Sequence, residues 1–331
     1  MHSELTTSFA DPGIPTLESV LDPSALSRHV FPILPQPWGE VRSFQIQVLQ
    51  HHHGRRCTVS IMLQTADGHH EVVGKIYAED RADVYRAMEE ISRAGFGPEK
   101  EFSIPQPLAY VPELHLLLQE KVTGQSVTEI FIKGGERECV AAAERCARWL
   151  AHFHLQGPRS GAPFILSREL MERWARRLAK RAGSQARPLA DKAKLLVERL
   201  VRTAPEHTEM CAGHGGYYHS QIISTQTRTV TFDWDNHCVA DPSRDVARFI
   251  FTLQQLALQS LSSLKALDAA GKAFCNTYAA TSGFEVAKHI PFYKAAHCLK
   301  HARYHLKQEG GGFEKNEAML DEGLRVLAEE M

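Results

Sequence analysis

The spacing of apolar residues between Phe44 and Tyr77 constrains this chain more than any other feature. Three segments alternate apolar and polar side chains, which is the period of a β-strand: residues 44–49, 57–64 and 70–77. The gap before the last segment holds Asp67 and Gly68, a dipeptide typical of tight hairpin turns. We therefore expect an antiparallel meander of three strands.

After these strands the period changes to that of a helix. One helical face is formed by four apolar residues: Val84, Ala87, Met88 and Ile91. The pattern stops at Gly95, and one further strand is expected over residues 114–122. The remaining sequence is mostly helical in pattern, except for short strands expected at residues 221–224 and 229–234.

These patterns divide the chain into a proline-rich lead-in over residues 1–40, a β-rich lobe over 41–124 and a helical lobe over 125–331. A chain of 331 residues is longer than one core usually organises, so we expect two lobes with a ligand-binding cleft between them. The expected fold class is α+β. The lead-in is expected to hold one short helix, capped by Asp22 with Pro23 in its first position.

Composition narrows the range of partners. The 38 basic and 39 acidic side chains give a formal charge of -1, which provides no positive field for nucleic acid or an anionic membrane. The N-terminus lacks a secretion signal pattern, and no long apolar run occurs. Seven scattered cysteines without a CxxC pair favour reduced thiols. We expect a cytoplasmic protein that acts on a small molecule, while the sequence gives no indication of its oligomeric state.

Two carboxylates in TVTFDWDN are the first candidate site residues. If Val230, Phe232 and Trp234 share one strand face, Asp233 lies on the opposite face at the strand's end and Asp235 follows just beyond it. Carboxylates at such a position can bind Mg²⁺ together with substrate phosphates. A turn rich in Asp and Asn is the structural alternative, and the same DxD pattern occurs in nucleotide-sugar transferases.

Lys75 lies in the middle of the third expected strand and shares a face with Val73 and Tyr77. A lysine among apolar residues is costly to bury unless its ammonium group meets an anion. Glu89 and Glu90 of the following helix are both candidate partners, and the helical period does not decide between them. The alternative is a lysine on an edge strand that blocks further pairing.

Three further segments contain candidate polar residues. HGGYYHSQ, residues 214–221, fits zinc poorly because its two histidines have neither helical nor finger-like spacing. HHHGRR, residues 51–56, is expected to be a solvated hairpin end, with contact of Arg55 and Arg56 to phosphate as the alternative. In ADPSRDVA we expect Asp241 to cap a helix, and Asp245 to be buried where it can hold backbone N–H groups of a neighbouring loop.

Taken in order, these segments resemble the phosphotransferase enzyme family that includes aminoglycoside phosphotransferases and choline kinase relatives, which have a protein-kinase-like fold of two lobes. The family's catalytic loop, HGDxHxxN, is similar to HGGYYHSQ, and its metal motif, IDW followed by GDPxxDLA, is similar to FDW and ADPSRDVA. The lysine of its third strand corresponds to Lys75, and its linker between the lobes resembles LLLQEKVTG. The similarity runs from about Arg55 to Leu258.

The resemblance implies ATP- and Mg²⁺-dependent phosphotransfer to an alcohol group of a small molecule. It also implies that Lys75 contacts the α and β phosphates, and that Asp233 and Gln221 bind Mg²⁺. Backbone groups from Glu120 to Val122 would meet the adenine ring.

The chain departs from the family pattern at two positions of the catalytic loop. Gly216 stands where the family has the aspartate that accepts the hydroxyl proton, and Gln221 stands in place of asparagine. A general base typically contributes about 10² to 10⁴ in rate, whereas phosphoryl transfer depends mostly on positioning and charge neutralisation. Loss of the base therefore weakens a kinase without necessarily abolishing it. Asp235, His219, Tyr217 and Tyr218 are candidates for a substitute base, and we favour Asp235 or His219 because each can lie in the same cleft.

Two other hypotheses remain open at this point. Gly216 favours a pseudokinase that binds a nucleotide or metabolite without turnover. A DxD glycosyltransferase would require an N-terminal domain of alternating strands and helices, which the three-strand meander argues against. The basic residues over 173–181 offer no acidic surface for a polycationic aminoglycoside, which disfavours an antibiotic as the acceptor.

Overall fold

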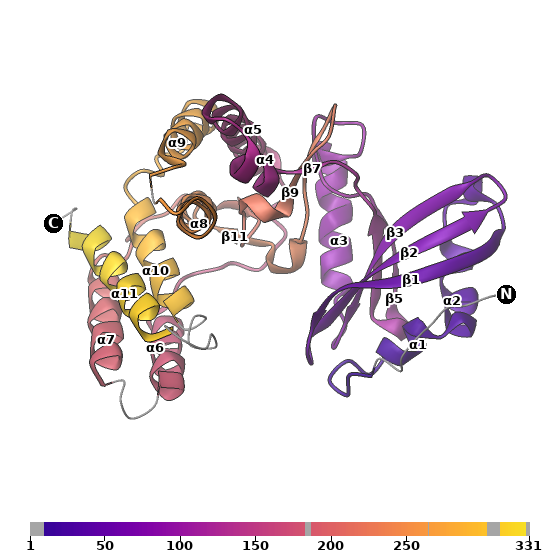
Figure 1. Cartoon of the computed structure of the whole chain (residues 1–331), viewed down its shortest axis with the longest axis horizontal. Coiled ribbons are helices and arrows are strands. Elements are labelled where there is room, and N and C mark those ends of the chain that lie inside the picture. The colour runs from indigo at the N-terminus through magenta and orange to yellow at the C-terminus, as the bar shows by residue number, and fades with distance from the viewer. Residues whose placement is uncertain (1–9, 183–186, 264, 303–311, 329–331) are drawn as a thin grey trace. The chain divides into compact units, whose positions relative to one another are not determined.

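In the computed structural model the described residues are 10–182, 187–263, 265–302 and 312–328. The chain, which Figure 1 colours from the N-terminus to the C-terminus, divides into two compact units by its internal contacts. Unit 1 comprises the described residues up to Gln125 together with Ile223–Asp235. Unit 2 comprises Ser126–Ile222 and the described residues from Asn236 onward. The first nine residues of the lead-in lie outside the described part.

Unit 1 is built on a five-stranded antiparallel sheet with the strand order β1-β2-β3-β6-β5. Its strands are β1 (Val41–His52), β2 (Arg56–Thr65), β3 (His69–Tyr77), β5 (Pro107–Val111) and β6 (Leu116–Glu120). The first three form the expected meander, with Gly68 at a positive φ of 139° in the second turn. Strand β3 is hydrogen-bonded on both sides, so the edge-strand explanation of Lys75 is wrong.

The alternating pattern buries one face of this sheet under the lead-in. Two helices of the lead-in, α1 (Leu17–Leu21) and α2 (Pro23–His29), contribute to this core beside the sheet (Figure 1). Members of the core include Leu17, Val20, Leu26, Val59, Ile61, Val72, Ile76, Leu116 and Leu118. Asp22 caps α2 as expected, since its Oδ1 accepts a hydrogen bond of 3.0 Å from the Ser24 N–H.

A helix and most residues of a second, smaller sheet complete unit 1. Helix α3 (Ala82–Ile91) buries the four expected apolar residues and continues into the turn η3 (Ser92–Phe96), where Gly95 has a φ of 106°. The smaller sheet has the order β4-β10-β9-β7. Its strands are β4 (Phe102–Ser103), β7 (Gln125–Ser126), β9 (Ile222–Ser224) and β10 (Thr229–Thr231). Short helical turns are η1 (Phe31–Ile33), η2 (Gln36–Trp38) and η4 (Pro112–Leu114).

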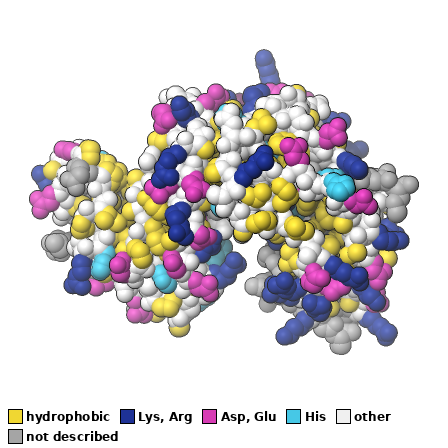
Figure 2. Space-filling model, turned by 180° about the vertical axis from the view of Figure 1, so that it is seen from behind, with side chains coloured by type: hydrophobic (Ala, Val, Ile, Leu, Met, Phe, Trp, Pro, Cys, Tyr) yellow, Lys and Arg dark blue, Asp and Glu magenta, His cyan; other side chains and the backbone are white. Residues whose placement is uncertain are grey.

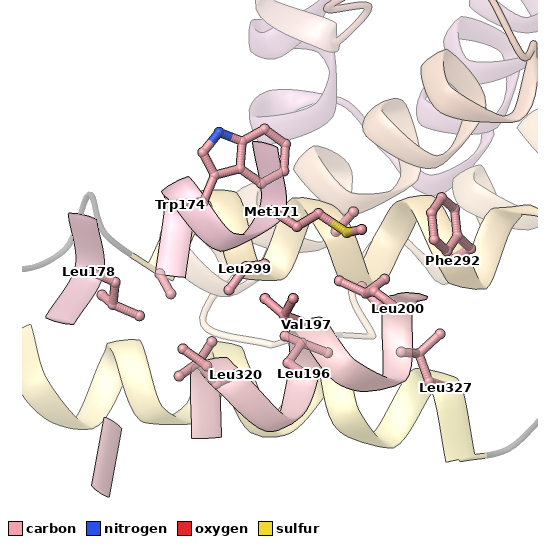
Figure 3. Packing of buried hydrophobic residues seen from close by; sticks show 14 of the residues in the cluster. Met171, Trp174, Leu178, Leu196, Val197, Leu200, Phe292, Leu299, Leu320 and Leu327 are labelled. Carbon is pink, nitrogen blue, oxygen red and sulfur yellow. The ribbon is translucent and has the colours of Figure 1, made fainter. Parts of the chain in front are cut away.

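Unit 2 is mainly helical, which together with the sheet of unit 1 confirms the expected α+β class. Its helices are α4 (Val127–Lys133), α5 (Glu136–Gln156), α6 (Arg168–Ala182), α7 (Arg187–Arg202), α8 (Ser243–Leu261), α9 (Asp268–Ser282), α10 (Ile290–Ala302) and α11 (Gly312–Ala328). An antiparallel pair, β8 (Cys211–Gly213) and β11 (Cys238–Ala240), lies among them. Figure 3 shows the core shared by α6, α7, α10 and α11, in which Leu196, Leu200 and Leu320 are among the buried side chains.

The surface charges and the cysteines agree with what the composition indicates, namely balanced charge and reduced thiols. Basic and acidic side chains are interspersed on the face shown in Figure 2. Within the described ranges, no helix combines the length and apolar character needed to cross a bilayer. All seven cysteines are free thiols, and Cys139 and Cys146 are buried on α5, as expected for residues that fill one face of a helix.

Candidate active site

Three polar side chains project from one face of the sheet in unit 1. Lys75 and Tyr77 are two residues apart on β3, and residues at that spacing share a face. Arg56, the first residue of β2, pairs directly opposite Tyr77 in the antiparallel ladder. Residues directly opposite each other across two strands also share a face. The register therefore brings Arg56, Lys75 and Tyr77 together.

A tight turn after β10 presents the two carboxylates. Strand β10 ends at Thr231, so the expected alternation through Trp234 is wrong. Asp233 instead has a left-handed backbone, with φ of 73°, a conformation that Asp tolerates better than most residues. Trp234 is buried, begins the turn η7 (Trp234–Asn236) and donates from Nε1 to the Thr231 carbonyl at 3.2 Å. Because the ladder has ended, Asp233 and Asp235 reach the same set of partners.

These five residues form a charge cluster, a term we use for Arg56, Lys75, Tyr77, Asp233 and Asp235. Lys75 Nζ donates to Asp233 Oδ1 at 3.0 Å and to Asp235 Oδ1 at 3.1 Å. Arg56 Nη1 donates to Asp233 Oδ1 at 2.9 Å and also contacts Asp235 Oδ2. The Tyr77 hydroxyl donates to Asp235 Oδ1 at 2.9 Å. Two cations thus meet two carboxylates, and the formal charges cancel.

Burial makes this compensation necessary. The Lys75 side chain is 6% exposed and that of Asp235 is 13% exposed, and an unpaired charge at such a depth is costly. Burial disfavours the charged form of Arg56, but the carboxylates of Asp235 and Asp233 outweigh it and raise the pKa of Arg56. Burial also raises the pKa of Tyr77, so its hydroxyl keeps its proton and serves as a donor.

The partners of Lys75 differ from the two glutamates considered in the sequence. Among the described residues, the carboxylates that Lys75 Nζ contacts are Asp233 and Asp235. Glu89 instead pairs with Arg93 along the helix, at 3.1 Å. Arg56 was expected in a solvated hairpin end. It is instead the first residue of β2, and its side chain is largely buried against Asp233.

The sequence alone did not single out Tyr77 as a site residue, nor did it place Arg56 beside the carboxylates. Tyr77 carries a usable signal, because it lies two residues from Lys75 on the same strand face. Arg56 carries none until the length of the β1–β2 turn fixes which residue lies opposite Tyr77.

The segment that resembles the linker between lobes follows β6. The Glu120 carboxylate accepts from the Gln106 N–H at 3.0 Å and from Arg228 Nη2 at 2.5 Å, so its side chain fixes the end of the strand. Val122 is buried. A cavity of about 660 Å³ lies beside this segment and is lined by Thr123, Gly124, Gln125, Ser224, Thr225, Gln226 and Thr227.

In unit 2, Asp245 on α8 organises the loop that resembles the catalytic loop. Its carboxylate accepts from the backbone N–H groups of His214 at 2.7 Å, Gly215 at 3.2 Å and Tyr217 at 3.4 Å. The expectation that Asp245 holds backbone groups of a neighbouring loop is therefore confirmed. Burial would raise the pKa of Asp245, but its interaction with His154, whose Nε2 lies 3.6 Å from Oδ2, and the positive charge of Arg244 outweigh burial and hold the pKa below the ordinary value.

The two adjacent glycines of this loop have different structural requirements. Gly215 has a φ of 77°, and a Cβ added there would lie 2.0 Å from the Asn236 carbonyl oxygen. A side chain at this position is excluded by both backbone and space. A Cβ added to Gly216 would meet nothing within 4 Å, and its φ lies outside the left-handed range. Glycine is therefore not required at position 216.

His219 and Gln221 lie at the end of the same loop, in the turn η6 (His219–Gln221), and both are buried. His219 Nδ1 is 2.8 Å from the Thr128 hydroxyl oxygen. Burial lowers the pKa of His219 to about 4, so the imidazole is neutral at pH 7 and a weak proton acceptor. These two residues belong to unit 2, whereas all members of the charge cluster belong to unit 1.

Solved structures of small-molecule kinases share this fold. A choline/ethanolamine kinase family protein from Mesorhizobium loti matches with a TM-score of 0.55 at 14% identity, covering 95% of this chain and 97% of that one. An amicoumacin kinase in complex with AMP-PNP, Ca²⁺ and Ami matches with a TM-score of 0.63 at 10% identity, covering 95% and 96%. A putative fructosamine-3-kinase from Thermobifida fusca matches with a TM-score of 0.55 at 19% identity, covering 88% and 95%.

These similarities define the fold as protein-kinase-like, with an antiparallel sheet in its N-terminal part and helices in its C-terminal part. The sequence model of the phosphotransferase enzyme family matches residues 64–284, which is more than half of the chain. The chain belongs to this family, and its class is that of small-molecule phosphotransferases. No curated protein sequence matches it.

Proposed function

We propose that the protein transfers the γ-phosphoryl group of ATP, in the presence of Mg²⁺, to a hydroxyl group of a small molecule. The observation that carries the proposal is the charge cluster, in which two cations contact two carboxylates. It occurs in a chain that belongs to the phosphotransferase enzyme family. Ammonium and guanidinium groups bind phosphate oxygens, and Mg²⁺ prefers carboxylate oxygens together with phosphates. A nucleotide with its metal ion therefore offers each of the four groups a partner of opposite charge.

In this proposal Lys75 and Arg56 bind the phosphates, while Asp233 and Gln221 hold Mg²⁺. Bound Mg²⁺ would neutralise charge on the transferring phosphoryl group. Backbone groups between Glu120 and Val122 would bind adenine. Support for a nucleotide with a divalent cation comes from the amicoumacin kinase, whose structure contains AMP-PNP and Ca²⁺.

Of the two candidate bases, we favour Asp235. His219 is buried and its low pKa makes it a poor proton acceptor at neutral pH. The oxygens of Asp235 accept hydrogen bonds from Tyr77, Lys75 and Arg56. If Lys75 and Arg56 turn to phosphate when the nucleotide binds, a carboxylate oxygen of Asp235 becomes available to accept the hydroxyl proton.

A second candidate function, nucleotide binding without turnover, is favoured by Gly216 alone. The open space around this residue makes the variant Gly216→Asp a direct probe. If the natural protein lacks a base, the variant should gain about 10² to 10⁴ in rate. If another group already serves, the variant should give no gain.

The test of phosphotransfer is ADP release from ATP and Mg²⁺ in the presence of a panel of hydroxylated metabolites. Turnover should be lost in Asp233→Ala and kept in Asp67→Ala, which removes an exposed carboxylate from a hairpin turn of the same unit. Full turnover by Asp233→Ala would refute the role given to that residue. Thermal stabilisation of the natural protein by ATP and Mg²⁺ without ADP release would favour the binding function.

A further inference from the structure

A second cluster of polar side chains lies in unit 1, where the lead-in meets the turn between β1 and β2. Asp11 comes from the lead-in, and His51 and His53 come from the end of β1 and the turn that follows. One ligand atom of each residue, a carboxylate oxygen or an imidazole nitrogen, lies within 4.8 Å of the others. No member of the charge cluster belongs to this group.

The Asp11 carboxylate is held in one orientation by backbone groups. Asp11 is 5% exposed. Its Oδ1 accepts from the Gly13 N–H at 2.9 Å, and its Oδ2 accepts from the Gly54 N–H at 2.8 Å. A Cβ on Gly13 would lie 2.4 Å from the Gly54 Cα, so two glycines allow the lead-in and the turn to approach this closely. Outer hydrogen bonds of this kind orient a carboxylate ligand.

Both histidines direct a ring nitrogen at the same carboxylate oxygen. His51 Nε2 is 2.7 Å from Asp11 Oδ2, and His53 Nδ1 is 3.2 Å from it. His52 lies between them in sequence, and alternation along the strand directs its side chain to the opposite face. Accordingly, the pKa of His52 is lowered mainly by burial and then by the positive charges of Arg56 and Arg55.

A simple structural clamp does not account for this arrangement. The hydrogen bond from the Gly54 N–H already fastens the turn to Asp11, and His51 adds a second one. The side chain of His53 is 82% exposed, and ordering an exposed side chain for one solvated contact contributes little stability. Convergence of a second imidazole on an oxygen that is already bonded calls for another explanation.

We propose that Asp11, His51 and His53 bind a divalent transition-metal ion of the zinc type. Imidazole nitrogen and carboxylate oxygen are the ligands that such ions prefer. At bond lengths of about 2.0 to 2.1 Å, tetrahedral ligand atoms lie about 3.3 Å apart. The two imidazole nitrogens lie 2.7 and 3.2 Å from Asp11 Oδ2 and within 4.8 Å of each other, so side-chain movements alone can bring the three atoms to this spacing. Water completes the coordination, and the exposed His53 gives the ion an entry path.

The bound ion would join the lead-in to the hairpin that carries Arg56. Asp11 and His51 are 40 residues apart in sequence. A metal that cross-links them stabilises the folded state, because the preformed site is absent from the unfolded chain. This inference does not depend on phosphotransfer, because its ligands and its test are separate from the charge cluster.

The test is calorimetric titration of the full chain, without a polyhistidine tag, with Zn²⁺. We expect one ion per chain. Co²⁺ in place of Zn²⁺ should give the visible absorption band of a tetrahedral site. Affinity should fall by about tenfold or more in His53→Ala, and His52→Ala, the matched control, should bind as the natural protein does. Because His53 is exposed, its removal leaves the fold unchanged, which circular dichroism can verify.

The variant Asp11→Asn supplies an independent arm, because it keeps the size of the side chain but removes its charge. We expect it to weaken Zn²⁺ binding as His53→Ala does, and Zn²⁺ should raise the Tm of the natural protein more than that of either variant. Absence of Zn²⁺ binding by the natural protein would overturn the proposal. Equal binding by His53→Ala, or equal loss in His52→Ala, would overturn it as well.

Discussion

Replacing Asp245 with asparagine should destabilise the protein far more than its small change in shape implies. In the natural protein one carboxylate oxygen accepts from the N–H groups of His214 and Gly215, and the other accepts from that of Tyr217. Asparagine keeps one acceptor and puts an NH₂ group in place of the other. In either orientation of the amide, at least one buried N–H then faces a donor.

The magnitude follows from these contacts. A buried polar group left without its partner costs about 1 to 3 kcal/mol, and a hydrogen bond to a charged group contributes about 1.5 to 3 kcal/mol. Because three backbone N–H groups donate to the Asp245 carboxylate, we expect the free energy of unfolding to fall by about 3 to 5 kcal/mol. For a unit of this size the Tm should fall by about 6 to 20 °C.

The stabilisation that Asp245 provides should also depend on pH, in a direction set by its pKa. The pKa of Asp245 in the folded state lies below its ordinary value of 3.8. The stabilisation by the ionised carboxylate is therefore complete above about pH 5 and is lost as the pH falls below the ordinary value. The difference in unfolding free energy between the natural protein and Asp245→Asn should accordingly shrink as the pH is lowered from 5 towards 3.

Urea unfolding followed by far-ultraviolet circular dichroism, repeated across this pH range, measures both effects. Asp191→Asn, which changes an exposed carboxylate on α7, should alter stability by less than about 0.5 kcal/mol. A loss of less than about 1 kcal/mol in Asp245→Asn at pH 7 would contradict this prediction. A difference in unfolding free energy between the natural protein and Asp245→Asn that stays constant as the pH falls would contradict it as well.

Three further predictions concern stability. Gly215→Ala should lower the free energy of unfolding by more than about 2 kcal/mol, because a Cβ there meets the Asn236 carbonyl oxygen. Gly216→Ala should leave the free energy of unfolding nearly unchanged, and equal denaturation midpoints for the two variants would contradict this. Leu200→Ala should cost about 2 to 5 kcal/mol in calorimetry, since Leu200 is fully buried in the core of Figure 3, and a smaller cost would mean that the core collapses around the cavity. Tyr77→Phe should cost about 1 to 2 kcal/mol, because it removes a donor to a buried carboxylate, and an unchanged free energy of unfolding in urea would show that the bond is replaceable.

The large sheet was predictable to the extent that its strands carry their own signal. The meander of β1, β2 and β3 could be read because each strand alternates and a hairpin dipeptide separates two of them. Strand β5 was missed because Pro107 and Pro112 flank it, and proline argues against a strand. It is an edge strand in the structure, where the missing N–H of a first-position proline does no harm.

The site was less readable than the fold, because it depends on relations that local patterns do not contain. Lys75 and Asp233 are 158 residues apart in sequence, and only the resemblance to a family connected them. The left-handed backbone at Asp233 ended the strand early and overturned the assignment of faces beyond Thr231. By contrast, Asp245 was predictable, because a carboxylate one turn into a helix, near its apolar boundary, has few satisfying environments other than backbone N–H groups.

The position of Lys75 within the sheet has a consequence for how this protein can respond to a ligand. Its strand is bonded to β2 on one side and β6 on the other, so its backbone cannot shift without breaking two ladders at once. Asp233, by contrast, belongs to a short irregular turn. Adaptation therefore differs between the two partners: the Cα of Lys75 is a fixed reference point from which only the side chain can turn toward a ligand, whereas at Asp233 the backbone of the turn can move as well.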